Sequence, residues 1–339
     1  LPAPDDFDPR VSLFKTIWVT HSGDLFGLPG RLLIDLVGLI VVALCLTGLI
    51  VTFIRIPIRR RLKHGDPALP LRRTWTFSFL WHNRLGSLFI VFLLLIVVTG
   101  MFLRPPLLIP IARAQVAPLP GSTLHSNNPW NDRLRRLRYD AIGKQWLLAA
   151  SSGIYAFPAF GAQPRKLHNT PPVSVMGLNV WQQVAPARWV VGSFSGIYVW
   201  DLSDGSVMDY DTGLPLNAHG GGFRRGFSGR PSFSNPVSGF SADFVQGPVV
   251  FDYGHGARLS TSPDAPFAPM PEVFSRDGRI SFWNFCLELH VGRLYRSFLF
   301  AFTDFYIFLS GLSMFLVVLS GYIVYRRKHR RKPRRRRQS

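Results

Sequence analysis

Residues 21–53 read HSGDLFGLPGRLLIDLVGLIVVALCLTGLIVTF, and this stretch decides the fold. It opens on a histidine, passes a Gly-Leu-Pro-Gly break and becomes an apolar run interrupted by one acid, Asp35. A helix needs about 20 mainly apolar residues to cross roughly 30 Å of hydrocarbon. The run at 32–54 therefore predicts a spanning helix that is preceded by a short approach carrying His21.

The same pattern returns near the end of the chain. His290 begins the sequence HVGRLY, which matches HSGDLF from His21, and a second long apolar run follows at 298–325. The chain thus repeats one unit, in which a histidine precedes an apolar helix. Neutral imidazole is a good axial ligand for haem iron. Two imidazoles brought to one membrane surface by equivalent helices therefore predict a bis-histidine metal or haem site.

The two copies also share small residues and a basic end. Aligning Gly38 with Gly311 places Thr47-Gly48 on Ser320-Gly321, with a slip of four residues relative to the histidines. Glycine on a membrane helix permits close helix packing, or leaves room for a flat macrocycle, and the pattern alone does not choose between the two.

The formal net charge of +20 is concentrated in two places. Residues 55–73 hold seven Lys or Arg against one acid, and residues 326–339 hold ten and no acid. Both segments adjoin apolar runs, which is the pattern of basic residues retained on the cytoplasmic face. Membrane lipid, with anionic headgroups, is the expected partner of such segments, and nucleic acid is not.

These runs predict a membrane α-helical bundle with a β-rich periplasmic domain. Three spans are visible, and the outside N-terminus is most simply explained by a fourth span that precedes Leu1 in the full protein. The expected segments are a periplasmic stretch at 1–30, transmembrane helices at 31–54 and 81–104, a basic cytoplasmic loop at 55–80, the periplasmic domain at 105–285, a histidine-bearing approach with the third span at 286–325, and a basic cytoplasmic tail at 326–339.

The periplasmic domain contains a short repeat. The segment from Trp146 to Tyr155 returns from Trp189 to Tyr198, so that the two copies lie at about 146–157 and 189–200. A period in the forties with Trp-Asp is typical of a propeller blade, but two copies are too few to close a propeller. We therefore expect a small two-repeat β domain. The two cysteines, Cys45 and Cys286, are expected about half a membrane apart and hence unbonded.

Other ionisable residues beside the spans are secondary candidates. His82 precedes the second span at the cytoplasmic side, so it would need a different partner from His21. Asp35 and Asp304 each follow an outer histidine by 14 residues, close to four helical turns, and are candidates to orient a ligand, balance haem charge or pass protons. Arg293 and Arg296 are candidates to bind haem propionates or lipid phosphates. The alternatives are a water-bonded interface histidine, a capping carboxylate and solvated arginines.

Residues 13–61, with HSGDLFGLPGRLL and LTGL, resemble the PepSY-associated transmembrane family. WHNRLG from Trp81, followed by VTG ending at Gly100, resembles the second helix type of that family, and LHVGRLY from Leu289 is a degenerate copy of the first. The resemblance covers about a third of the chain. The chain departs from the family pattern because no first helix is present and 104–285 does not read as a clean PepSY repeat.

The resemblance implies a multi-pass bacterial inner-membrane protein with four core helices. Some members of the family resemble ferric-siderophore reductases that hold two b-type haems between the helices. By that resemblance His21 and His290 would hold the periplasmic haem. His82 would hold the cytoplasmic haem, with its partner on a helix that this chain does not contain.

Three functions are compatible with the residues. The leading hypothesis is haem-dependent electron transfer across the membrane, from an unidentified donor to a periplasmic ferric chelate or siderophore, which would make the chain a ferric reductase for iron uptake. The second is a non-enzymatic, membrane-anchored periplasmic binding protein, and the third is a subunit that transports an iron chelate. No Walker loop, nucleophile elbow, zinc-protease motif or dinucleotide fingerprint is present in the sequence.

Overall fold

The structure is a computed structural model that describes residues 1–112, 114–174, 177–216, 236–253, 256–262, 269 and 271–330. The chain divides into two compact units. The β unit comprises 1–8 and 127–279, and the helical unit comprises 9–126 and 280–339. Residues 331–339, most of the expected basic tail, lie outside the described residues.

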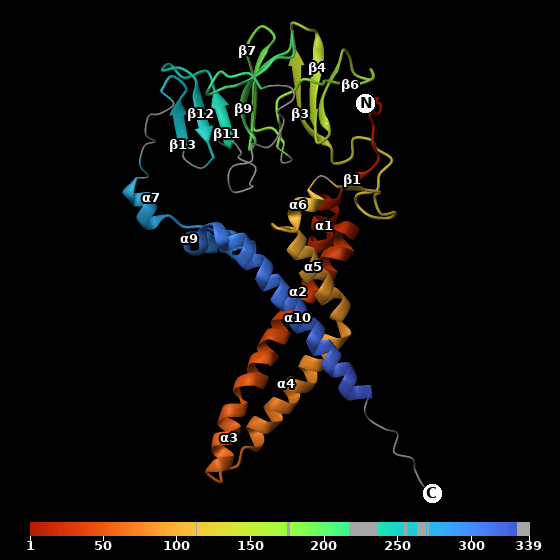
Figure 1. Cartoon of the computed structure of the whole chain (residues 1–339), viewed down its shortest axis with the longest axis vertical. Coiled ribbons are helices and arrows are strands. Elements are labelled where there is room, and N and C mark those ends of the chain that lie inside the picture. Colours follow the sequence, from red (N-terminus) through yellow and green to blue (C-terminus); the bar gives the residue numbers. More distant parts are fainter. Residues whose placement is uncertain are drawn as a thin grey trace. The chain divides into compact units, whose positions relative to one another are not determined.

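The β unit contains three antiparallel sheets in which consecutive strands pair with their neighbours (Figure 1). The first consists of β3 (Leu134–Asp140), β4 (Gln145–Ala150), β5 (Gly153–Phe157) and β6 (Arg165–Lys166). The second consists of β7 (Val180–Ala185), β8 (Arg188–Ser193), β9 (Gly196–Asp201) and β10 (Val207–Asp209). The third consists of β11 (Val237–Ser241), β12 (Val249–Asp252) and β13 (Gly256–Leu259), and α7 (Glu272–Asp277) follows it.

The sequence repeat corresponds to two equivalent hairpins. The first copy forms β4 and β5, the second forms β8 and β9, and a positive-φ glycine, Gly153 or Gly196, begins the return strand in each. A third sheet follows the two repeat-bearing sheets, because β11–β13 form another antiparallel meander. Its strands lack the tryptophan and the Gly-Ile-Tyr sequence that marked the first two copies, so sequence similarity did not reveal it.

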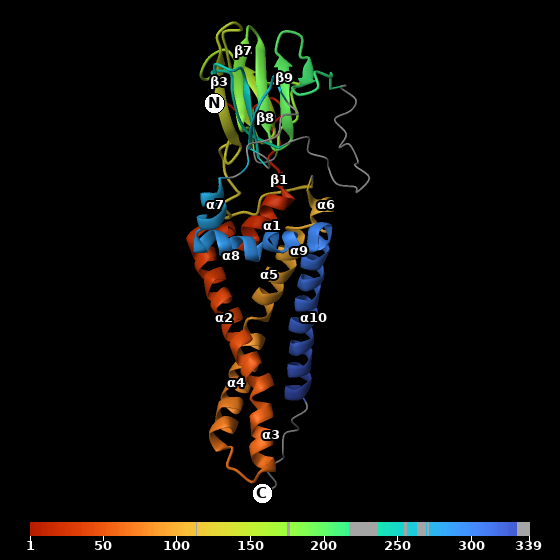
Figure 2. The ribbon, with the colours of Figure 1, turned by 90° about the vertical axis from the view of Figure 1, so that its left-hand side faces the viewer.

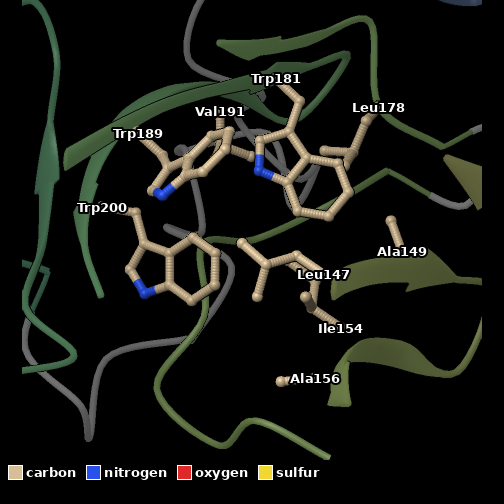
Figure 3. Packing of buried hydrophobic residues seen from close by; sticks show 9 residues of the cluster. All are labelled: Leu147, Ala149, Ile154, Ala156, Leu178, Trp181, Trp189, Val191 and Trp200. Atoms are coloured by element: carbon tan, nitrogen blue, oxygen red, sulfur yellow. The ribbon is translucent and has the colours of Figure 1, made fainter. Parts of the chain in front are cut away.

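Apolar side chains join the sheets of the β unit through their faces. The largest cluster combines β4 and β5 of the first sheet with the second sheet, where Trp181, Trp189 and Trp200 lie together beside smaller aliphatic residues such as Leu147 (Figure 3). A second cluster joins the second and third sheets through Val190 and Val250. Indole and aliphatic groups removed from water in this way contribute roughly 1.5–3 kcal/mol for each fully buried side chain. The β unit therefore has a hydrophobic core of its own.

The N-terminal segment covers the outer face of the first sheet. The indole Nε1 of Trp130 donates a hydrogen bond to the Pro2 carbonyl oxygen at 2.9 Å. The Lys166 ammonium lies 2.7 Å from an Asp6 carboxylate oxygen. These contacts attach residues 1–8 to the β unit, although the chain then continues directly into the helical unit.

The helical unit consists of short helices at one end of longer ones (Figure 2). Its N-terminal part contains β1 (Val11–Ser12), α1 (Leu13–Ser22), η1 (Asp24–Phe26), α2 (Gly27–Phe53) and α3 (Arg55–Lys63). The middle part contains α4 (Leu69–Leu88), α5 (Ile90–Phe102), α6 (Leu108–Ile111) and β2 (Gln115–Val116), which pairs with β1. The C-terminal part contains α8 (Phe282–His290), η2 (Arg293–Tyr295), α9 (Arg296–Leu299), η3 (Phe300–Phe302) and α10 (Thr303–Arg330).

Among the described residues, two helical stretches are long and apolar enough to cross a membrane. They are Asp24–Lys63 and Thr303–Lys328, and α4 with α5 forms a third candidate that bends by 68° at Phe89. The second span, expected at 81–104, is thus a bent pair rather than one straight helix. The expected loop at 55–80 is also largely helical, because α3 occupies its first part and α4 begins at Leu69. Cys45 and Cys286 are both free, which confirms that they form no disulfide.

Candidate functional site

His21 lies on the last turn of a short capped helix. The Ser12 hydroxyl accepts a hydrogen bond from the Lys15 amide and thereby caps the start of α1. Gly23 ends the helix with a φ of 82°, in the left-handed region that glycine adopts without strain. A Cβ at Gly23 would lie 2.5 Å from the Gly30 carbonyl oxygen, so this position also permits the start of α2 to pack closely.

His290 lies in a second copy of the same local structure. Ser281 caps α8 by accepting a hydrogen bond from the Asn284 amide, and Gly292 follows with a φ of 77°. The spacing from capping serine to histidine, and from histidine to glycine, is the same in both copies. The expected repeat of the approach segment is therefore present as backbone structure.

The four-residue slip between the copies has a structural cause. In the first copy, η1 leads directly to Gly27, which has a φ of 63° and a ψ of −141°. In the second copy, the four-residue helix α9 is inserted before Phe300, which has a φ of 46° and a ψ of −122°. From these two matching backbone positions onward, Gly38 and Gly311 are in step. An insertion of about one helical turn lengthens the path without rotating the following helix by much.

The two expected outer ligands lie side by side. The ring centroids of His21 and His290 are 6.0 Å apart, and their planes differ by 29°. Two imidazole nitrogens that each lie about 2 Å from one metal place their ring centroids roughly 6 Å apart. Among the described residues, no three His, Cys, Asp or Glu gather to hold a metal ion. In the described part of the chain, the pair therefore offers two imidazole rings without a third such side chain beside them.

The orientation of the His21 ring is set by α5. The Thr99 hydroxyl donates to the Leu95 carbonyl oxygen at 2.7 Å and lies 3.0 Å from Nδ1 of His21. With the hydroxyl proton on the Leu95 carbonyl oxygen, the threonine oxygen is left to accept a hydrogen bond from Nδ1 of His21. Nε2 then carries the lone pair that a metal needs. Burial above all, and then the charge of His290, hold the pKa of His21 below its ordinary value, which favours the neutral form.

Glycines permit the close approaches around this pair. A Cβ at Gly100 would lie 3.0 Å from Cε1 of His21, so this residue leaves space for the ring. A Cβ at Gly311 would lie 2.6 Å from Cγ of Met101, so this glycine lets α10 pack against α5. Gly100 thus leaves space for the imidazole ring, whereas Gly311 permits close helix packing.

Arg104 is a residue of the site that the sequence analysis missed. Its guanidinium donates a hydrogen bond to the Val291 carbonyl oxygen and lies 3.7 Å from the Asp304 carboxylate. These contacts tie the turn after His290 to the C-terminal end of α5 and to α10. The only sequence signal was an isolated arginine at the end of an apolar run, before two prolines.

The secondary candidates are not equivalent to one another. Asp35 is exposed on α2, whereas Asp304 is partly buried and paired with Arg104. Their equal spacing from the histidines does not make them structural equivalents, because α9 lengthens only the second copy. Nε of Arg293 already donates to a Glu288 carboxylate oxygen at 2.8 Å. Arg296 is exposed at the start of α9.

His82 lies on α4 and contacts α2 rather than the other two histidines of interest. Its Nδ1 is 3.1 Å from the Thr47 hydroxyl oxygen and 3.1 Å from the Leu44 carbonyl oxygen. A Cβ at Gly48 would lie 3.4 Å from Cε1 of this ring. In the described part of the chain, no second histidine stacks on His82 as His290 does on His21.

We compared the chain with known proteins at the level of family, sequence and structure. No protein-family model, no curated protein and no solved structure matches it.

Proposed function

We propose that this chain is a membrane haem protein in which His21 and His290 are the axial ligands of one haem, and that it transfers electrons to an acceptor outside the membrane. The observation that carries the proposal is the 6.0 Å separation of the two rings. Two helices whose histidines lie 269 residues apart in the sequence bring them to that spacing. Residues 13–61 also resemble the PepSY-associated transmembrane family in sequence, although no family model matches the chain.

The proposed orientation follows from the charges. The basic residues of α3 and the basic start of the C-terminal tail lie at the ends of α2 and α10 that are remote from His21 and His290. If those basic ends remain in the cytoplasm of a bacterium, the histidine pair and the β unit are periplasmic. The chain would then be a multi-pass inner-membrane protein that contacts lipid along α2, α5 and α10.

The proposed cofactor is haem b, held without covalent bonds to the protein. Covalent attachment uses a Cys-x-x-Cys-His sequence, and this chain has only Cys45 and Cys286, far apart. Such a haem supplies one-electron chemistry, while the protein sets its ligands, burial and orientation. His21 supplies a neutral nitrogen from a half-buried ring, whereas His290 is exposed, so the site is open on one side.

Chelated ferric iron outside the membrane is the proposed acceptor, as for a ferric reductase in iron uptake. Exposed Arg296 beside His290 presents positive charge on the side where an anionic chelate would arrive, whereas Arg293 is paired with Glu288. A second haem at His82 would need a further imidazole, and the electron donor would deliver its electrons on that side.

Optical spectroscopy of the detergent-purified protein tests the proposal. We expect haem to bind with the sharp reduced bands of a bis-histidine site, and we expect these bands to be lost in His21→Ala and in His290→Ala. His125→Ala is the matched control, because His125 is exposed and lies in the same unit outside the pair. Oxidation of the reduced protein by a ferric chelate, followed in a stopped-flow instrument, tests the acceptor.

A correctly folded protein that binds no added haem would overturn the proposal. That result would favour the alternative hypothesis, in which the helices anchor a periplasmic binding domain. Haem binding that survives both substitutions would instead show that the ligands lie elsewhere.

A further inference from the structure

Two histidines of this chain sit against a threonine–glycine pair in the same way. His21 of α1 contacts Thr99-Gly100 of α5, and His82 of α4 contacts Thr47-Gly48 of α2. In each case Nδ1 lies about one hydrogen-bond length from the threonine oxygen, at 3.0 Å and 3.1 Å. In each case the glycine leaves the space that Cε1 of the ring approaches.

The hydrogen bonds of the two threonines determine the direction of these contacts. Thr47 donates its hydroxyl proton to the Ala43 carbonyl oxygen at 2.7 Å, and Thr99 donates to Leu95 at the same distance. A threonine hydroxyl has one proton and two lone pairs, so each oxygen is left as an acceptor. With the hydroxyl protons placed on those carbonyl oxygens, the facing histidine donates from Nδ1. The Leu44 carbonyl oxygen, 3.1 Å from Nδ1 of His82, can only accept, and it requires the same tautomer.

The consequence lies at the other nitrogen of each ring. A neutral imidazole that donates from Nδ1 carries its lone pair on Nε2. Ligand histidines are commonly held by such a bond from the nitrogen that does not touch the metal, and the bond fixes both tautomer and ring orientation. Threonine is a suitable acceptor inside a membrane helix because its own proton is satisfied by the preceding turn.

The contacts also cross between two helix pairs. The pair α1–α2 carries His21 and Thr47, and the pair α4–α5 carries His82 and Thr99. Each pair supplies the threonine that receives the histidine of the other pair. The alignment of the histidine-bearing units adds Ser320-Gly321 on α10, where nothing lies within 4 Å of the position of a Gly321 Cβ. Among the described residues, no imidazole ring therefore approaches Gly321 as His21 approaches Gly100.

We propose that Thr99 and Thr47 are positioning residues for metal ligation, each accepting the Nδ1 proton of the facing histidine so that Nε2 is presented to the iron. For Thr99 this inference rests on the proposed function, since His21 is the ligand it orients. For Thr47 the inference is that His82 is held in the same tautomer as His21 and can bind a metal through Nε2. Neither threonine touches the metal.

The test compares Thr99→Val, which keeps the shape of the side chain and removes the acceptor, with Thr99→Ser, which restores it. Ser320→Ala is the matched control, because among the described residues the Ser320 hydroxyl bonds within its own helix, to the Val317 carbonyl oxygen at 3.1 Å. The first readout is the ¹⁵N spectrum of histidine-labelled protein before haem is added, with the His21 signals identified by their loss in His21→Ala.

We expect wild type, Thr99→Ser and Ser320→Ala to show His21 protonated at Nδ1 only. We expect Thr99→Val to show a mixture of tautomers, because the threonine acceptor is lost. The second readout is haem affinity by titration, where loss of such an outer partner weakens metal binding by about 10–100-fold. Haem that is bound should also show a raised midpoint potential in Thr99→Val, since a less basic imidazole stabilises ferric iron less.

The outcomes separate the two proposals. If wild type binds haem and Thr99→Val has the same tautomer, affinity and potential, the positioning role is wrong and the proposed function stands. If wild type binds no haem, the proposed function is wrong, and so is the role of Thr99 in metal ligation. In that case the ¹⁵N spectrum of Thr47→Val still shows whether Thr47 adds to the Leu44 carbonyl oxygen in setting the tautomer of His82.

Discussion

Substitution of Gly100 by alanine tests how closely the His21 ring must approach α5. The added Cβ would lie 3.0 Å from Cε1 of His21, whereas carbon atoms in favourable contact lie about 3.5–4.0 Å apart. The ring must therefore move by a few tenths of an ångström, or α1 must move with it. Metal–ligand distances tolerate only about 0.2 Å, so such a displacement disturbs ligation directly.

The chain offers a graded series of controls for this substitution. A Cβ at Gly48 would lie 3.4 Å from His82, which is a mild contact, and a Cβ at Gly38 would meet nothing within 4 Å. We expect Gly100→Ala to weaken haem binding at His21 by at least about tenfold, in the range seen when partners of metal ligands are altered. We expect Gly48→Ala and Gly38→Ala to leave binding at His21 unchanged.

Haem titration of the purified apoprotein, followed at the Soret band, measures this effect. Thermal unfolding of the same samples shows whether the variants remain folded, since alanine is intrinsically favoured over glycine in a helix by up to about 1 kcal/mol. The reasoning is refuted if folded Gly100→Ala binds haem as tightly as Gly38→Ala. The ring would then not be confined by α5, and the contact with Thr99 would not orient it.

Three further predictions concern other parts of the molecule. Val191→Ala, at a fully buried position between the first two sheets, should destabilise the β unit by about 2 kcal/mol in denaturant unfolding followed by tryptophan fluorescence, whereas Val245→Ala, at a position 99% exposed, should have no effect. Arg104→Gln should speed amide hydrogen exchange in η2 and at the C-terminal end of α8, because the turn between them loses its link to α5; equal exchange rates would show that the link is not needed. Burial raises the pKa of Asp6, but the hydrogen bond and charge of Lys166, together with the Tyr155 hydroxyl, outweigh burial and hold the pKa below 3.8. Attachment of residues 1–8 should therefore persist above pH 3.8 and weaken as the pH falls through the lowered pKa. Lys166→Ala should move that loss to higher pH, as measured by NMR of the N-terminal amides.

Much of the helical unit was predictable because its signals are local. A long apolar run and adjoining arginines predicted α2 and α10, and a histidine followed by glycine predicted the approach segments. The bend at Phe89 was not predictable from hydropathy, because both α4 and α5 continue the same apolar or amphipathic pattern up to it. In the β unit, the tryptophan repeat identified two sheets. The third sheet uses other residues for the same backbone pattern.

The residues of the candidate site also divide into those that local sequence predicted and those that only the structure revealed. His21 and His290 were recognisable because both copies keep the residues that shape the backbone around them. Thr99 was not, because its importance depends on a contact with a residue 78 positions away. The pairing of Asp35 with Asp304 by equal spacing was misleading, since counting residues does not reveal that one copy contains an extra helical turn.

The sequence by itself determined the apolar runs of α2 and α10, the residues that cap and end the approach helices, and the basic segments that adjoin the apolar runs. Those properties depend on side chains within a few turns of one another, on capping groups and on transfer from water to hydrocarbon. Only the tertiary structure decided which side chains meet. Helices approach closely where glycine leaves room, and that approach brings His21 to Thr99, His290 to His21 and Arg104 to the turn that follows His290. A contact of this kind arises from the packing of both partners at once, and neither segment encodes it alone.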